Sequence, residues 1–373
     1  KGMEVAHINR DGVTKKVKIT AVMSFQGMSR IEVDEVFAGD IAAIAGIPDV
    51  SIGETIADPA NPVALPTIAI EEPTVKMTFG ISTSPFAGQE GQYTTSRQIK
   101  ERLEHELETD VALKMFATDS AEKWVMAGRG ELHLAILIEK MRREGFELQV
   151  SKPQVIFKEV EGKKLEPIEH VTVEVPENFA GTVIEKMGKR RGEMKDMKVE
   201  NKTAYLEFVI PTRGLIGYRS ELLTDTKGLG IMNSLFLGYE DYKGDFEANE
   251  HGSLIAFEDG ETRTYSLVAA QERGQLFLGP GVHVYCGMIV GKNAKAEDLE
   301  VNVCKEKKLS NMRSKGDGAA ESLDTPRTMS LEDALEYIGD DELVEVTPKN
   351  IRLRKMLLDP NDRKRQLRDS RAE

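Results

Sequence analysis

The sequence has little of what stabilises a protein covalently: Cys286 and Cys304 are its only cysteines. Two cysteines are too few for a disulfide scaffold or for a zinc site made of cysteine alone, so a reducing, cytoplasmic setting is expected. Long apolar runs are missing too. No segment approaches the roughly 18 uninterrupted apolar residues of a membrane-spanning helix, and residues 1–10 lack the pattern of a signal peptide. We therefore expect no membrane partner.

Signatures of catalysis are also missing. A nucleotide-hydrolysing phosphate loop needs Gly-x-x-x-x-Gly-Lys followed by Ser or Thr, whereas the Gly-Lys pairs that begin at residues 162, 188 and 291 are followed by Lys, Arg and Asn. The six histidines lack metal-binding spacing, and no Ser-His-Asp or Cys-His arrangement can be assigned. We expect no catalytic residue, cofactor or metal ion within these residues.

What is present is a long, charged chain of globular composition. Its 373 residues predict two or three domains, and 40% hydrophobic with 30% charged residues is typical of a globular protein. The net charge of −13 by itself disfavours a nucleic-acid partner. The charge is uneven, however, because the last 25 residues carry +5 and the first 348 carry −18.

Three stretches are basic: residues 186–191, 305–327 and 349–373. Each alone is most simply a solvated surface, but three of them favour a shared anionic partner. Residues 305–315 (KEKKLSNMRSK) lack aromatic side chains, which suits contacts with phosphate and ribose better than base stacking. Residues 310–327 are poor in apolar side chains and predict a long flexible loop, whether it serves binding or is simply disordered.

The first 65 residues have the pattern of short β-strands. Residues 15–25 (KKVKITAVMSF) alternate and predict one strand, and residues 31–36 and 41–45 predict two more, separated by glycine turns. Such spacing is typical of a small barrel. Too few strands precede residue 15 to close it, so we expect a barrel without its first strand or two. Prolines at 59, 62 and 66 predict a stiff linker.

From residue 74 the pattern changes to two successive βαββαβ units, the order of a ferredoxin-like domain. The first unit is predicted to have strands at 75–79, 111–117, 122–126 and 146–150, with helices at 96–108 and 131–145. The second is predicted to have strands at 170–175, 194–199, 203–210 and 230–237, with helices at 179–187 and 214–223. The two units repeat an architecture, not a sequence.

The remainder is predicted to be mostly β. Strands are expected at 252–257, 263–269, 275–278, 282–290, 343–346 and 351–358, and a short helix at 330–337 begins at Ser330 as N-cap. The basic tail is expected to fray. Near the end of the second unit, residues 211–218 (PTRGLIGY) place a glycine turn before a helix. Arg213 and Arg219 at this turn are candidates for phosphate contacts, although a tight turn alone would explain the glycines.

Several motifs together resemble one family. Residues 38–46 and 52–55 resemble the second domain of translational GTPases, and residues 128–134 (GRGELHL) resemble the third-domain motif of elongation factor G and LepA. The segments TRGLIGYRS (212–220), TDTKG (224–228), GIMN (230–233), AQERGQ (270–275), NMRS (311–314), EVTP (345–348) and IRLRK (351–355) are similar to the BipA (TypA) family of ribosome-associated translational GTPases. The resemblance covers essentially the whole chain.

The resemblance implies a multidomain α+β fold. Its expected parts are a truncated translation-factor β-barrel (1–66), two ferredoxin-like domains (67–158 and 159–243) and a β-rich, family-specific C-terminal domain (244–373). It also implies that the family's GTP-binding domain, with its GTP and Mg, is absent from this chain. A ribosome-dependent GTPase activity would belong to the full-length protein, which the family links to large-subunit assembly and to stress or cold adaptation.

The implied partners are the ribosome's rRNA, tRNA and ribosomal proteins, contacted by a monomer. In the family the C-terminal domain reaches towards the tRNA acceptor end and large-subunit rRNA. The expected RNA-binding residues are Lys305, Lys307, Lys308, Asn311, Arg313, Lys315, Arg327, Arg352, Arg354, Lys355, Arg213, Arg219, Lys189 and Arg190. Two alternatives stay open: part of an elongation factor G or LepA, or a metabolic enzyme that uses ferredoxin-like domains as a scaffold.

Overall fold

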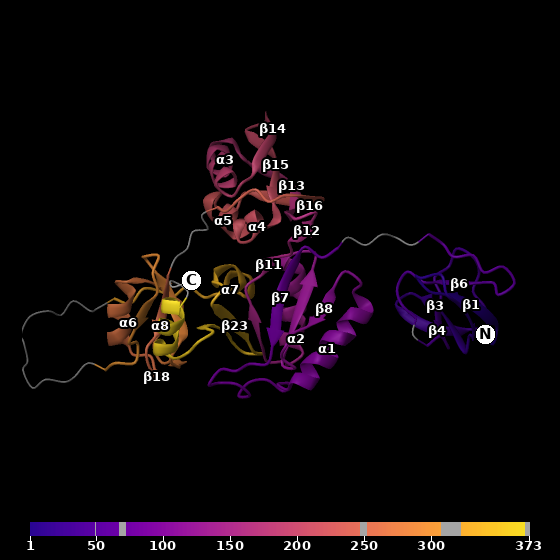
Figure 1. The fold of residues 1–373 in the computed structure, drawn as a ribbon, viewed down its shortest axis with the longest axis horizontal. Coiled ribbons are helices and arrows are strands. Elements are labelled where there is room, and N and C mark those ends of the chain that lie inside the picture. Colours follow the sequence, from indigo (N-terminus) through magenta and orange to yellow (C-terminus); the bar gives the residue numbers. More distant parts are fainter. Residues whose placement is uncertain (49, 67–71, 247–251, 307–321, 370–373) are drawn as a thin grey trace, which may run out of the picture. The chain divides into compact units, whose positions relative to one another are not determined.

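The computed structural model describes residues 1–373 except 49, 67–71, 247–251, 307–321 and 370–373 (Figure 1). The chain divides into two compact units, one of Lys1–Glu71 with Glu104–Ala112 and one of Glu72–Leu103 with Leu113–Glu373. No helix in the described part combines the length and the apolarity needed to cross a membrane.

The N-terminal residues form two small antiparallel sheets. Their strands are β1 (Glu4–Ile8), β2 (Thr14–Lys18), β3 (Ala21–Gln26), β4 (Ser29–Val33), β5 (Ala43–Ala45) and β6 (Thr55–Ala57), in the orders β2-β1-β6 and β4-β3-β5. The single strand predicted for 15–25 is wrong, because Ile19 and Thr20 donate backbone hydrogen bonds to Met3 and Ala45 and divide it between the two sheets. Among the described residues, no strand pairing joins the sheets into a closed barrel.

The first ferredoxin-like domain has the predicted order of elements. It consists of β7 (Val75–Gly80), α1 (Ser96–Thr109), β8 (Lys114–Ala117), β9 (Lys123–Gly128), α2 (Glu131–Arg143) and β10 (Leu148–Ser151). Helix α2 buries Leu134, Leu137, Ile138 and Met141, which recur at the helical period. The short strand β11 (Gln154–Val155) returns to pair with β7.

The second ferredoxin-like domain is a five-stranded sheet with helices on one face. Its elements are β12 (Lys158–Val160), β13 (Lys163–Pro176), α3 (Ala180–Lys189), β14 (Glu193–Glu200), β15 (Thr203–Pro211), α4 (Thr212–Leu215), α5 (Tyr218–Asp225) and β16 (Ile231–Asp241). The strand order is β16-β13-β15-β14, with β12 paired to the start of β13. The predicted helix at 214–223 is instead two short helices, because Gly217 adopts a left-handed φ of 73° between them.

The C-terminal domain continues the sheet of the first ferredoxin-like domain. Strand β23 (Glu342–Val346) pairs antiparallel with β10, and the sheet runs on through β24 (Ile351–Lys355), β21 (Met288–Asn293), β17 (Ser253–Ala256) and β22 (Leu299–Val301). Two domains predicted from the sequence, 67–158 and 244–373, therefore share one sheet. The other elements of this domain are β18 (Gly260–Glu261), α6 (Thr264–Gln271), β19 (Gly274–Leu276), β20 (His283–Val284), α7 (Leu331–Tyr337) and α8 (Pro360–Asp369).

Three predictions for the C-terminal domain are wrong. The single strand predicted at 282–290 is divided by a turn at 285–287 into β20 and β21. Residues 263–269, predicted as a strand, belong to helix α6, which buries Leu267 and Ala270 one turn apart against the domain core. The tail, expected to fray, contains helix α8, which starts at Pro360 and has Asp362 in its first turn and Arg368 in its last. The N-cap prediction is confirmed: Ser330 and Asp333 form a reciprocal capping box at the start of α7.

Candidate functional site

Helix α6 anchors both ends of the basic segment 305–327. At one end, Arg263 Nε lies 3.2 Å from the Glu306 carboxylate. At the other, the Gln271 amide donates to the Ser322 carbonyl at 2.8 Å and accepts from the Asp324 N–H at 3.0 Å. The two ends of this segment are thus tied to opposite ends of an eight-residue helix, on the order of 10 Å apart.

Within this segment Lys305 is exposed, whereas the predicted residues Lys307, Lys308, Asn311, Arg313 and Lys315 lie outside the described residues. Arg327 is exposed as well and is held in place by two contacts. Its backbone N–H donates to Leu276 at 2.9 Å, and its guanidinium lies 2.7 Å from Asp333 of α7. Lys292 lies close enough that Arg327, together with burial, lowers the pKa of the Lys292 ammonium.

Two of the predicted site residues of β24, Arg354 and Lys355, are buried, and the third, Arg352, is half-buried. Arg354 is 2% exposed and donates to Thr83 at 2.7 Å and to Gln149, while its Nε lies 3.5 Å from Glu345. Arg352 pairs with Glu90 and stacks over a phenylalanine ring. A buried charge is tolerated only when it is paired, so these two arginines hold the shared sheet together. Their predicted contact with RNA is corrected accordingly.

Lys355 is buried in the same way, at 3% exposure. Its ammonium lies 2.5 Å from Asp298, 2.9 Å from Asp341 and 2.9 Å from Glu342. These carboxylates more than offset the effect of burial and raise the pKa of Lys355. With three acidic partners around it, this lysine has no free positive charge to offer a phosphate, and its prediction is corrected too.

Arg213 and Arg190 have structural roles in the second ferredoxin-like domain. Arg213 donates to the fully buried Glu166 at 2.5 Å and to the Gly244 carbonyl at 2.6 Å, with its guanidinium over the Tyr242 ring. Arg190 donates to the Gly214 and Ile216 carbonyls at 2.9 and 3.0 Å and pairs with Glu221 at 2.8 Å. Both side chains are half-buried and largely engaged in holding the turns around α4, and their contact with RNA stays a prediction.

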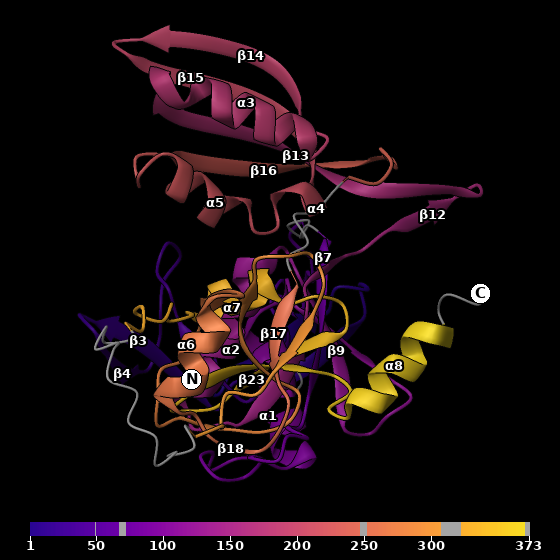
Figure 2. The same ribbon diagram turned by 90° about the vertical axis from the view of Figure 1, so that its left-hand side faces the viewer.

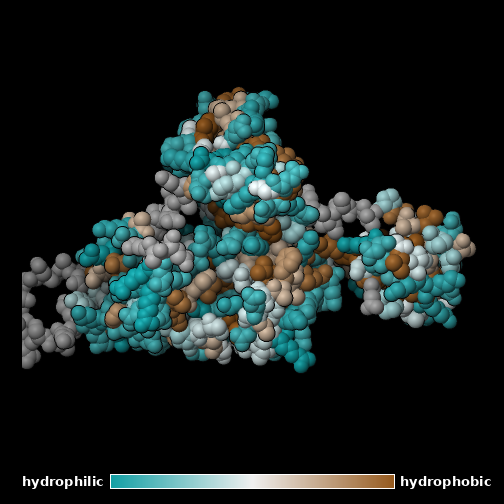
Figure 3. All heavy atoms as spheres, in the orientation of Figure 1, coloured by the Kyte–Doolittle hydropathy of each residue, from teal (hydrophilic) through white to brown (hydrophobic). Residues whose placement is uncertain are grey.

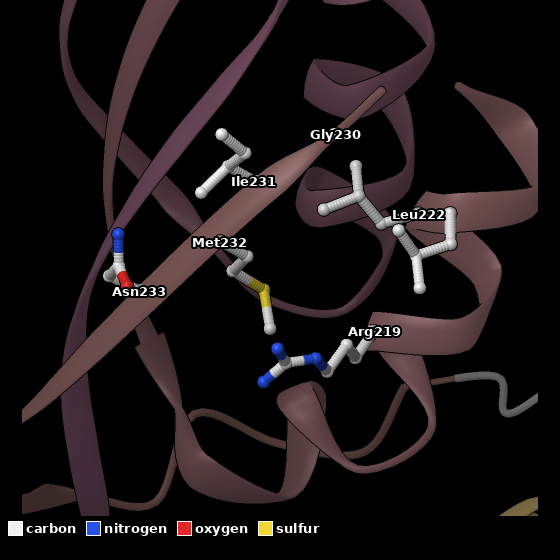
Figure 4. A pocket seen from close by; sticks show the side chains of 7 residues that line it. Arg219, Leu222, Gly230, Ile231, Met232 and Asn233 are labelled. Atoms are coloured by element: carbon white, nitrogen blue, oxygen red, sulfur yellow. The ribbon is translucent and has the colours of Figure 1, made fainter. Parts of the chain in front are cut away.

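Lys189 and Arg219 remain at the surface of this domain. Lys189 pairs only with Glu185 at 2.6 Å, one turn away on the exposed face of α3. Arg219 is exposed and lines a cavity of about 190 Å³ between α5 and the start of β16. Figure 4 shows its side chain extending towards Met232. These two residues, with Lys305 and Arg327, are the described members of the predicted set that can meet an anion.

Helix α8 adds basic residues that the sequence analysis did not assign to a site. Arg363 anchors the helix, donating to the Leu357 and Leu358 carbonyls and to Glu300 at 3.0 Å. Lys364 and Arg368 are exposed. The positive charge of residues 349–373 could have pointed to these residues. The sequence analysis predicted a frayed tail there and therefore missed the helix on which they lie.

Three segments meet at a pair of carboxylates. Glu131 begins α2, accepts a hydrogen bond from the Gly217 N–H and faces Glu336 of α7. Burial, followed by the charge of Glu336, raises the pKa of Glu131 to about 7. Burial also raises the pKa of Glu336 and outweighs a hydrogen bond from Ser220, which lowers it. The junction joins the first ferredoxin-like domain, the second one and the C-terminal domain.

Comparisons with known proteins match the parts of this fold. Residues 251–360 match the TypA/BipA C-terminal domain, residues 163–249 match the elongation factor G C-terminus, and residues 1–57 match elongation factor Tu domain 2. The chain thus combines translation-factor domains with a C-terminal domain that characterises one family.

Relatives named large ribosomal subunit assembly factor BipA align along almost the whole chain. That of Synechocystis is 51% identical over 356 residues (95% of this chain, 60% of the relative), and that of Bacillus subtilis 46% over 366 residues (98% and 60%). That of Salmonella typhimurium is 47% identical over 372 residues (99% and 61%). The chain therefore spans about 60% of the length of these relatives. With this identity and a TypA/BipA C-terminal domain at residues 251–360, the chain belongs to the TypA/BipA family.

Proposed function

We propose that this chain is the ribosome-binding part of a TypA/BipA-type translational GTPase that acts in assembly of the large subunit. The observation that carries the proposal is the alignment of 95% or more of the chain with relatives named large ribosomal subunit assembly factor. The order of translation-factor domains supports it. The family's C-terminal domain disfavours an elongation factor G or LepA origin, and the names of the relatives disfavour a metabolic enzyme.

The contact with RNA is proposed for the basic segment on α6. Lys305 and Arg327 are exposed at its two ends, and the segment between them carries Lys307, Lys308, Arg313 and Lys315. Positive side chains that replace counterions on phosphates give affinity without base specificity. We propose that this segment meets large-subunit rRNA and the tRNA acceptor end, with Arg219 and Lys189 as secondary contacts.

GTP hydrolysis is proposed for the longer protein that the relatives represent, with GTP and Mg bound outside these residues. In the described part, no group of three His, Cys, Asp or Glu side chains is arranged to hold a metal ion. We also propose that the protein is cytoplasmic and monomeric and has a role in stress or cold adaptation.

Co-sedimentation with ribosomes tests this function. The chain should pellet with ribosomes at low salt, and neutralising Lys307, Lys308, Arg313 and Lys315 to Gln should weaken binding. Each lost phosphate contact should also lower the slope of log affinity against log salt by roughly 0.7 to 0.9.

A matched control neutralises four exposed basic residues of the first ferredoxin-like domain, which removes the same charge from another surface. These are Arg97, Lys100, Lys114 and Lys123. If both variants lose the same affinity for ribosomes, the loss follows from net charge alone. That result would contradict the assignment of RNA binding to segment 305–327. Failure of the unchanged chain to pellet at any salt concentration would contradict the ribosome-binding function.

A further inference from the structure

The sheet of the second ferredoxin-like domain has one face that its own helices leave uncovered. Helices α3 and α5 pack on the other face, where Val171, Val173, Leu206 and Phe208 are buried in the domain core. Figure 2 shows α3 lying along the sheet formed by β13, β14, β15 and β16. Because side chains alternate along a strand, the intervening residues project from the opposite side.

The pairing register places twelve residues on this open face in three rows. His170 Nε2 lies 3.4 Å from Glu207 Oε2 on the neighbouring strand, which agrees with both residues projecting from the same side. Each row runs from β16 across β13 and β15 to β14. The rows are Ile231, Glu174, Tyr205, Lys198; then Asn233, Thr172, Glu207, Asp196; then Leu235, His170, Val209, Glu193.

Three apolar side chains of the open face are exposed. Ile231 and Leu235 on β16 are 55% and 62% exposed, and Tyr205 on β15 is 37% exposed. Figure 3 shows apolar residues at the surface of this domain among hydrophilic ones. Exposed aliphatic and aromatic side chains on one face of a regular sheet mark a surface that gains from being covered.

The rest of the open face is acidic. The three rows hold four carboxylates, Glu174, Glu193, Asp196 and Glu207. Two of them have a lysine partner on their own strand: Asp196 lies 3.3 Å from Lys198, and Glu193 lies 2.8 Å from Lys195. Neighbouring carboxylates repel phosphate, so this surface is a poor one for RNA. Opposite charge on a partner would steer association and set the orientation of docking.

We propose that the open face docks a basic protein surface that also carries apolar side chains. The apolar side chains cover Ile231, Leu235 and Tyr205, and the basic side chains pair with the carboxylates. The proposal rests on the proposed function in one respect: the partner is then a basic protein of the large ribosomal subunit, and not its RNA. The basic segment on α6 and the acidic open face would contact different components of one particle.

Cysteine labelling on bound and free protein tests the proposal. In a background with Cys286→Ser and Cys304→Ser, Asn233→Cys reports on the middle row of the open face, at its β16 edge, and Thr182→Cys on α3 is the matched control at an exposed position of the helical layer. Maleimide labelling should slow at least tenfold at position 233 when the chain is saturated with large subunits. It should stay unchanged at position 182, and at both positions with protein-free rRNA.

Charge reversal separates a protein partner from RNA. The double variant Glu174→Lys/Glu207→Lys raises the net charge by four, which would strengthen attraction to RNA, yet we expect at least a tenfold loss of affinity for the large subunit. The control Glu177→Lys/Glu185→Lys makes the same change at exposed positions on the helical side of the domain and should retain affinity. Circular dichroism melting verifies that both variants fold.

Two results would overturn the proposal: unchanged labelling at position 233 while the chain is bound, or protection by protein-free rRNA. Increased affinity of the Glu174→Lys/Glu207→Lys variant would overturn it as well. If the unchanged chain does not co-sediment with large subunits at all, the proposed function fails and the docking proposal fails with it. That result is distinguishable from binding that leaves the open face accessible.

Discussion

At the scale of single residues, the buried charges explain why β24 is not a binding strand. Arg354 and Glu345 are 2% and 1% exposed, and each is the other's counter-charge within a low-dielectric interior. Exposed arginines such as Arg219 have no such constraint. The same residue type therefore serves packing at one position and is available to a ligand at another.

Replacing Arg354 by Leu tests this role. The change leaves Glu345 with only its weaker contact to Arg352 at 3.7 Å, apart from the Tyr285 hydroxyl that donates to it. Breaking a buried pair in this way costs about 3 to 5 kcal/mol. We expect a loss of that size in urea unfolding, whereas the exposed control Lys364→Met should change stability by less than about 0.5 kcal/mol. A loss below about 1 kcal/mol for Arg354→Leu would contradict the structural role.

Glu131 makes the stability of the three-domain junction depend on pH. Its pKa is raised from 4.5 to about 7 by burial and by Glu336, against the Gly217 N–H and Arg190, with Glu169 adding a further negative charge. The folded protein therefore holds a proton that the unfolded chain releases, and stability should fall as pH rises from about 4.5 to 7. The loss amounts to at most about 3 kcal/mol and levels off above pH 7.

Unfolding measured between pH 5 and 8 checks this prediction. Glu131→Gln keeps a neutral side chain at every pH, so its stability should vary less over this range and exceed that of the unchanged protein at pH 8. Glu122→Gln, on an exposed turn, is the matched control and should leave the pH profile unchanged. Parallel profiles for Glu131→Gln and the unchanged protein would contradict the assignment.

At the scale of elements, short helices depend on their ends. Helix α7 has seven residues, and its start is fixed by the Ser330 hydroxyl, which accepts from the Asp333 N–H at 3.1 Å. Asp333 also holds Arg327, so the cap positions one end of the basic segment. Isolated helices of this length are unstable, which makes the cap and the burial of Leu331 and Leu335 decisive.

Ser330→Ala should therefore destabilise the C-terminal domain by about 1 kcal/mol. It leaves the Asp333 N–H without its acceptor. Thermal unfolding of the whole chain measures the effect, and Ser322→Ala, whose side chain is exposed, provides the control. Equal stability of the two variants would show that the cap contributes nothing.

At the scale of the whole molecule, one sheet joins two domains that are distant in sequence. Strands β10 and β23 exchange backbone hydrogen bonds, and Arg354 reaches Gln149 across 205 positions of sequence. The C-terminal domain should therefore unfold together with the first ferredoxin-like domain. The domain that holds the basic segment is thus stabilised by the first ferredoxin-like domain as well as by its own core.

Hydrogen exchange tests the shared unfolding. Amides of β10, β23 and β24 should exchange slowly and with one common free energy of opening, because β10 and β23 lie between paired strands on both sides. The edge strand β22 is the internal comparison and should exchange faster. Clearly different opening energies for β10 and β23 would contradict a single cooperative unit.

The sequence determined what depends on local pattern: the order of the ferredoxin-like elements, the N-cap at Ser330 and the family. These follow from periodicity, capping and motifs within a few residues of one another. The candidate site was only partly predictable. The exposed Lys189, Arg219, Lys305 and Arg327 agree with the basic pattern, but the pattern also included the buried Arg354 and Lys355.

Only the tertiary structure decided which charges are free. Residues 351–355 (IRLRK) have the alternation of an exposed basic strand, and their burial depends on β21 and β23, which flank β24. Strand pairing and ion pairing between distant segments leave no local signal, because their energy comes from neighbours that the fold brings together. The open face of the second ferredoxin-like domain became visible for the same reason, once the register of its strands was known.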